Sequence, residues 1–190
     1  MPKLLAALIV VGLASLACPA PAQTFGPPIQ GVCVFDRRAA LDRSQAGVSA
    51  NQQIAQFAQG IRAELGAQRA AIVADDRALA ARKGATPAAQ YQEAVAQLRQ
   101  RYQALDQTAK TRDAQLRRTS DAAAELIGKA MGPALDVVLT EHRCALVVER
   151  ADLYGANPAM DITAPVIQAI NARLPLISLR LAPAGPTPAS

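Results

Sequence analysis

The sequence predicts an α+β protein: a small β-sheet body carrying a long, projecting helical hairpin that packs as an antiparallel coiled coil. Two long segments, 48–83 and 87–130, have apolar residues at helical spacing and are separated by a short turn. Short apolar runs at 31–35 and 144–149 have the composition of buried strands. Because these runs flank the helical region, the sheet must join the two ends of the chain.

The second long segment predicts the more regular helix. Its seam positions alternate steps of four and three residues from Tyr91 through Tyr102, Arg112 and Leu126 to Ala130. This is the 3.5-residue repeat of a coiled coil, in which each seam side chain packs between side chains of a partner helix.

Changes in composition divide the mature chain into a body, a hairpin and a tail. The expected boundaries are 23–47 and 131–175 for the β-rich body, 48–130 for the hairpin, 82–87 for its tip and 176–190 for a flexible, proline-rich tail. The outbound helix spans about 50 Å at about 1.5 Å per residue, so the hairpin must project from its body. Such a body has a very small core, so we expect several copies of the chain to complete one barrel.

Local signals add further expectations. Ser49 is the expected N-cap of the first long helix. Pro133 should kink the second one, because proline removes a backbone donor and clashes one turn back. Residues 150–155 are expected to form a third strand, and Thr163 to cap a last helix over 164–172.

The N-terminal segment has the features of a secretory signal peptide, covering residues 1–22. A positively charged start precedes an apolar run over 4–16, which is shorter than the about 20 residues that a membrane span needs. A small-x-small triplet ends at Ala22. Cys18 offers an alternative lipid attachment point, but Ser15 occupies the position where a lipidation box has a large aliphatic residue. We therefore expect export with cleavage after Ala22 rather than a lipoprotein.

The hairpin carries most of the excess positive charge. The formal net charge of the whole chain is +5, and residues 62–118 alone hold eleven basic against six acidic residues. A solvated helix face is the simplest interpretation of any one of them. Collectively they favour anionic lipid headgroups, acidic polypeptides or nucleic acid as partners. The candidate contacts for such acidic or anionic partners lie near the tip: Arg77, Arg82, Lys83, Arg99 and Arg101.

The sequence contains no set of residues typical of a catalytic or metal site. Its single histidine, His142, belongs to no cluster with metal-ligand spacing. Gly60 and Gly66 lack the following Lys-Ser/Thr of a phosphate-binding loop. We therefore expect no enzyme activity, metal or cofactor. Nucleic acid is also a poor partner, because the chain has no tryptophan and few aromatic residues for base stacking. Export would also separate the protein from cellular nucleic acid.

Two cysteines, Cys33 and Cys144, remain after signal-peptide cleavage. Export to an oxidising compartment permits a disulfide between neighbouring strands. Two small, buried, unpaired apolar side chains are the slightly preferred alternative from sequence alone.

Two stretches resemble a known family. The first is Gly31-Val32-Cys33-Val34-Phe35-Asp36, followed by Leu41, Ser44 and Gly47-Val48-Ser49. The second is more specific and comprises Leu146-Val147-Val148-Glu149-Arg150, Leu153-Tyr154, Pro158, Asp161-Ile162-Thr163 and Val166-Ile167. With the long basic hairpin between them, they are similar to the Skp/OmpH family of periplasmic chaperones over residues 31–174. The two cysteines and the tail after Pro175 depart from the family pattern.

The resemblance implies a homotrimer with a small β-barrel body and three helical tentacles around a cavity. It further implies an ATP-independent periplasmic holdase, without a cofactor, that binds unfolded outer-membrane β-barrel proteins and prevents their aggregation. An anionic lipid or lipopolysaccharide surface is a further expected partner. The alternative is a structural coiled-coil protein of the cell envelope that tethers a folded partner or a membrane surface.

Overall fold

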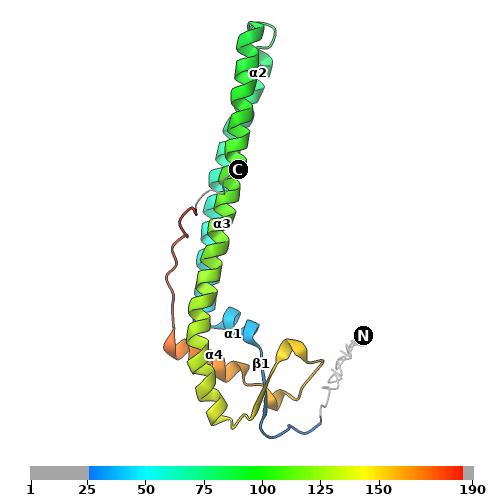
Figure 1. Ribbon diagram of the computed structural model, residues 1–190, viewed down its shortest axis with the longest axis vertical. Helices are drawn as coiled ribbons and strands as arrows, with labels where there is room; N and C mark the ends of the chain where they lie inside the picture. The colour runs from blue at the N-terminus through cyan, green and yellow to red at the C-terminus, as the bar shows by residue number, and fades with distance from the viewer. Residues whose placement is uncertain (1–25, 186–190) are drawn as a thin grey trace, which may run out of the picture.

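The computed structural model describes residues 26–185, which form two long helices rising from a small body (Figure 1). The expected signal peptide, its cleavage site and the alternative lipid site at Cys18 lie outside the described residues. The described residues are mostly helical and form one small sheet of two strands. The elements are β1 Val32–Phe35, α1 Arg37–Arg43, α2 Gln45–Ala81, α3 Ala88–Glu141, β2 Leu146–Glu149, the 3-10 turns Arg150–Asp152 and Pro158–Met160, and α4 Thr163–Arg173.

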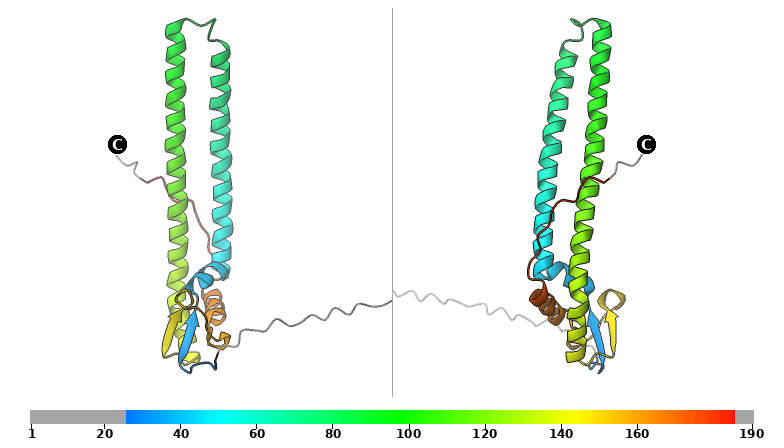
Figure 2. Two further views of the ribbon diagram at one scale, coloured as in Figure 1. Left: turned by 90° about the vertical axis from the view of Figure 1, so that its right-hand side faces the viewer. Right: turned by 60° about the vertical axis from the view of Figure 1, so that its left-hand side comes forward.

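The long helices α2 and α3 lie side by side and are connected by residues 82–87 at the end far from the body (Figure 2). Near that end they bury a small apolar cluster of Ile72, Leu79 and Leu98. Burying each such side chain contributes about 1.5–3 kcal/mol relative to leaving it exposed. Packing of this kind, rather than helix propensity alone, stabilises helices that extend so far from a core.

Near the body, the buried face of α3 differs from the predicted seam. Leu126 is 48% exposed, whereas its neighbour Ile127 is 3% exposed and Ala123 is 2% exposed. The buried row continues through Met131 and Ala134, also within the main core. A straight helix drifts relative to a 3.5-residue repeat, by about 20° per heptad. Near the body, α3 packs against α1 and α4 in addition to α2, so its buried face turns toward the body.

The body is built around β1. It pairs in parallel with β2 on one edge, with Val32 opposite Leu146 and Phe35 opposite Glu149. On its other edge, the carbonyl of Val34 accepts a hydrogen bond from the amide of Ile162. Helix α4 covers the core, and the side chains of Val166 and Ile170 are fully buried. Two segments that flank the long helices in sequence therefore meet in one sheet.

The predicted third strand is wrong. Residues 150–152 form a 3-10 turn, in which the amide of Leu153 donates to the carbonyl of Arg150. Ala151 and Asp152 have poor strand propensity. The second edge of β1 is instead occupied by the segment around Asp161.

Two helix starts use acceptors other than those predicted. Ser44, not Ser49, caps α2, because its hydroxyl accepts from the amide of Gly47 at 3.1 Å. Ile162 occupies the N-cap position of α4 without a side-chain bond, and the carboxylate of Asp161 before it accepts from the amide of Thr163 at 2.8 Å. The hydroxyl of Thr163 instead accepts from the amide of Asp36 at 2.9 Å, which links α4 to the end of β1.

The proline inside α3 does not end the helix, which runs unbroken past Pro133 to Glu141. An interior proline costs about 3 kcal/mol or more through its lost hydrogen bond and its steric clash. The adjacent side chains of Met131, Ala134 and Val138 are buried in the main core, and their packing offsets this cost.

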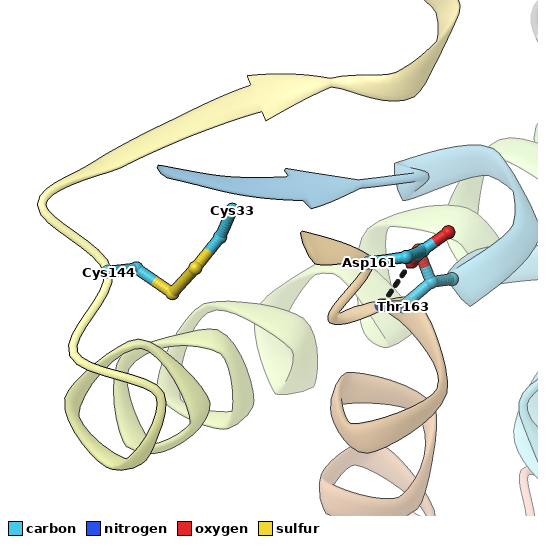
Figure 3. The surroundings of a disulfide bond; sticks show 4 residues. All are labelled: Cys33, Cys144, Asp161 and Thr163. Atoms are coloured by element: carbon cyan, nitrogen blue, oxygen red, sulfur yellow. Dashed lines mark hydrogen bonds between the residues drawn. A yellow bond between two sulfur atoms is a disulfide. The ribbon is translucent and has the colours of Figure 1, made fainter. Parts of the chain in front are cut away.

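A disulfide joins Cys33 in β1 to Cys144, just after α3 (Figure 3). The two Cα atoms are 5.7 Å apart, and the bond closes a loop with a sequence separation of 111. The sequence left open both a disulfide between neighbouring strands and two free thiols. The disulfide is present, but Cys144 precedes β2 and does not lie in it. The bond fixes the end of α3 against the sheet.

The segment after α4 is the largest difference from the sequence-based expectation. The sequence predicts a flexible tail from residue 176, but residues 176–183 run as an extended strand-like segment beside the long helices (Figure 2). Side chains from both long helices hydrogen-bond to its backbone. Residues 186–190 of the expected tail lie outside the described residues.

Candidate functional site

A long groove runs between α2 and α3 on one face of the molecule. Near the tip it is lined by Asp75, Ala78, Arg82, Ala94, Gln97 and Arg101. Closer to the body it is lined by Gln68, Ala71, Arg101, Ala104 and Thr108. Because both sections include Arg101, they form one continuous surface, which we call the upper groove.

The same face continues down to the body. On α3, the positions 97, 101, 104, 108, 112, 115 and 119 follow steps of three and four residues, which keep them on one side of a helix. Gln115 and Thr119, the last two of this row, contact the C-terminal segment. We call this section, with Ser49 and Gln53 of α2, the lower groove. The upper and lower grooves together are the interhelical groove.

The upper groove has an apolar floor and a polar rim. Ile72, Leu79 and Leu98 are buried beneath it. Alanines along both helices keep its walls low, so an extended polypeptide can approach the apolar floor. Arg82 and Arg101 stand at the rim near the tip. The groove is shallow and long, a shape suited to a flexible chain rather than to a small molecule, which needs a concave pocket.

All five predicted contact residues are exposed, but the structure brings only two of them to the groove. Arg82 and Arg101 line it, whereas Arg77, Lys83 and Arg99 are not among its lining residues. Arg101 pairs with Asp75 across the two helices. The side chain of Arg82 donates to the carbonyl of Ala78 at 3.3 Å, within its own helix.

The outer part of the helix pair keeps a strong excess of positive charge. Between residues 62 and 118, ion pairs join Arg101 to Asp75, Lys110 to Asp106, Arg112 to Glu64 and Arg117 to Asp113. Seven basic and two acidic residues of that range have no ion-pair partner among residues 26–185. The surface therefore attracts acidic groups over about one Debye length, or about 10 Å at 0.1 M salt.

A polar cluster lies where the upper groove meets the lower groove. The guanidinium of Arg112 donates to Glu64 at 2.9 Å and to Gln115 at 3.2 Å. Gln115 is 6% exposed, and the Nε atom of Arg112 is buried without a hydrogen-bond partner in the described part of the chain. Polar residues at a coiled-coil seam fix the register of the two helices. The seam repeat predicted that Arg112 faces the partner helix, but it gave no indication that Glu64 and Gln115 would bind it.

Sequence reasoning missed the residues of the lower groove. Gln53 and Gln115 are amide side chains on helices, and nothing in their spacing distinguishes them from other surface glutamines. The available signal was the alternation of Ile177, Leu179 and Leu181, which is typical of a half-buried strand.

The described residues offer little for acid–base or metal chemistry. Across residues 26–185, no group of three or more His, Cys, Asp or Glu side chains could hold a metal ion. A hydrogen bond from Lys129, reinforced by its positive charge, lowers the pKa of the exposed Glu125. This pair lies on α3 near the body, away from the upper groove. Among the described helices, none is both long and apolar enough to cross a membrane.

Comparisons with known proteins agree with this architecture. A family described as outer membrane protein (OmpH-like) matches residues 31–170. The crystal structure of a proposed outer membrane chaperone (OmpH-like) from Caulobacter crescentus CB15 is similar, with a TM-score of 0.78 and 25% sequence identity. The match covers 85% of this chain and 96% of that chain. The comparison with curated proteins gives no match.

Proposed function

The chain belongs to the OmpH-like family of outer membrane proteins, and from this premise we propose that it is an ATP-independent holdase chaperone of the periplasm. Its proposed clients are unfolded outer-membrane β-barrel proteins. The family and the similar structure support a chaperone role in general terms. The interhelical groove, with its apolar floor and cationic surroundings, is the observation that supports this specific role.

A holdase acts by binding the unfolded state in preference to the folded state, which withdraws the unfolded chain from aggregation. A long shallow groove provides many weak contacts. Together these contacts hold a client tightly while each one exchanges. The cations near the tip would attract acidic client segments, and the same cations could bind an anionic lipid or lipopolysaccharide surface. None of these steps requires a catalytic group, a cofactor or a nucleotide, so the proposed role is not that of an enzyme.

We further propose that three copies of the chain assemble through their bodies. The outer edge of β2 has no strand partner among the described residues, and an open edge is a template for pairing with another chain. Apolar side chains of the body also remain exposed, including Ile29 at 64%, Leu146 of β2 at 55% and the whole of Tyr154. In the proposed homotrimer these surfaces meet, and three helix pairs enclose a cavity. Native mass spectrometry should give three times the mature chain mass.

The proposed function is tested by diluting a denatured outer-membrane β-barrel protein into buffer that contains the purified protein but no nucleotide. We expect light scattering to stay low at one trimer per client, and to rise as salt screens the charges. Aggregation at the same rate as without the protein would contradict the proposal. A stoichiometric complex with a folded partner, without protection of unfolded clients, would instead support a structural tether.

A further inference from the structure

The C-terminal segment 176–183 occupies the lower groove in an extended conformation. Its residues alternate in exposure: Ile177, Leu179 and Leu181 are half-buried against the helices, while Leu176 before them and Ser178 and Arg180 between them are exposed. Ile177 and Leu179 pack against the main core cluster. The segment therefore presents one apolar face, as a strand of a β-sheet does.

The helices bind this segment through its backbone. Gln53 contacts it twice: its side-chain nitrogen donates to the carbonyl of Ile177 at 2.8 Å, and its side-chain oxygen accepts from the amide of Leu179 at 2.8 Å. The hydroxyl of Ser49 also donates to the carbonyl of Ile177, at 3.3 Å. All of these bonds go to backbone atoms, so they require an extended backbone at positions 177–179 but no particular side chains there.

Three side chains of α3 make the equivalent contacts further along. The hydroxyl of Thr119, 2% exposed, accepts from the amide of Ala182 at 2.9 Å. Gln115 donates to the carbonyl of Ala182 at 2.6 Å, and Arg118 donates to the carbonyl of Pro183 at 2.8 Å. Both helices thus supply fixed polar groups at the spacing of an extended peptide.

We propose that the lower groove is a binding site for extended polypeptide with apolar residues at alternate positions, and that the chain's own tail occupies it as a tethered competitor. Backbone hydrogen bonds are independent of side-chain identity, so the site accepts any segment of this pattern. Strands of β-barrel proteins have this pattern of alternation. That an unfolded client displaces the tail rests on the proposed function, but the affinity of the lower groove for the tail sequence does not.

Tethering sets how strongly the tail competes. Only Leu174, Pro175 and Leu176 separate α4 from the first bound residue, Ile177. A short tether gives an effective concentration of order 1 mM, so a free segment with a Kd of about 0.1 mM binds about tenfold more weakly while the tail is present. A long client that contacts several helix pairs at once overcomes this competition, whereas a short isolated segment does not.

The test uses a fluorescent peptide with the sequence of residues 175–185 and measures its binding by anisotropy. In the full mature chain, Ile177→Asp with Leu179→Asp places two charges against the core and releases the tail. The matched control, Leu176→Asp with Ser178→Asp, places the same charges on the exposed side of the same segment. We expect the released variant to bind the peptide about tenfold more tightly than the unaltered chain, and the control to bind it as the unaltered chain does.

Adding Gln53→Ala and Gln115→Ala to the released variant should abolish the gain, because these side chains hold the peptide backbone. Circular dichroism checks that helical content is retained. If the released variant keeps its helices but binds the peptide no better than the unaltered chain, the tail is a structural strap and the proposal is wrong.

A second measurement uses the unaltered chain and applies even if the variants fail to fold. Hydrogen exchange should show protected amides at Leu179 and Ala182, with lower protection at Arg180 and Leu181, which have no backbone donor bond among the described contacts. Excess peptide should remove the protection at Leu179 and Ala182. Protection that persists at saturating peptide would refute the competition. Peptide binding without protection of any client would refute the holdase function and leave the groove in place.

Discussion

The disulfide between Cys33 and Cys144 should make a large contribution to stability, because the loop it closes is long. Its sequence separation is 111 residues. In the chain-entropy model, closing a loop of about 100 residues removes about 4.7 kcal/mol of denatured-state conformational freedom, and measured losses for native disulfides are about 2–5 kcal/mol. The bond closes around the whole helix pair. Its loss should therefore loosen the attachment of α3 to β1 while leaving the tip unchanged.

The perturbation is Cys33→Ser with Cys144→Ser, compared with the unaltered chain in urea unfolding followed by circular dichroism. Protein concentration must be matched, because the stability of an oligomer depends on it. We expect the variant to lose about 2–5 kcal/mol, and the unaltered chain to lose the same amount when a reductant is added. The reductant should leave the variant unchanged.

Two results would refute this reasoning. Thiol titration of the denatured, unreduced mature chain should give no free thiol, and two free thiols per chain would show that the bond does not form. Equal unfolding midpoints for the variant and the unaltered chain would show that the bond forms but does not constrain the unfolded state.

Three further predictions concern packing and can be checked by the same unfolding assay. Gly47→Ala should lower the free energy of unfolding by at least about 1–3 kcal/mol, because a Cβ atom there would overlap the carbonyl oxygen of Leu41. Its control, Gly60→Ala, has open space around it and should raise the free energy of unfolding by up to about 1 kcal/mol. Equal effects of the two substitutions would show that the close approach at Gly47 is absent. Glu64→Leu should cost about 1–2 kcal/mol, between the values for exposed and buried pairs, because it leaves the half-buried Arg112 without its carboxylate. Adding Arg112→Leu should recover most of that loss, and a purely additive double variant would count against coupling. Ile127→Ala should cost about 2–5 kcal/mol and Leu126→Ala much less, in keeping with their exposures of 3% and 48%; the reverse order would restore the predicted seam.

The sequence predicted the features that depend on residue type and period. The run Val32–Phe35 is apolar and β-branched, and the steps of three and four along α3 specify a long amphipathic helix. That the two strands meet in one sheet was expected from their positions on either side of the helices, but the sequence did not predict their parallel direction. The strand and helix signals are local, so the residues of each segment themselves carry them.

The remaining features depend on contacts between distant segments. Leu126 satisfies the heptad repeat, yet the body turns the buried face of α3 toward Ile127. The tail contains prolines that suggest flexibility, but Gln53 and Thr119 bind its backbone in the folded chain. Of the five predicted contact residues, only Arg82 and Arg101 reach the groove, because charge alone does not specify which side of a helix a residue occupies.

Site-directed photo-cross-linking tests most directly whether the interhelical groove holds unfolded clients. A photoreactive residue is placed at Ala104, which lines the upper groove, and in a second variant at Gln103, which is exposed but outside it. After mixing with a denatured outer-membrane β-barrel protein, we predict strong cross-linking from position 104 and weak cross-linking from position 103. Equal yields from both positions, or none from position 104, would contradict the account.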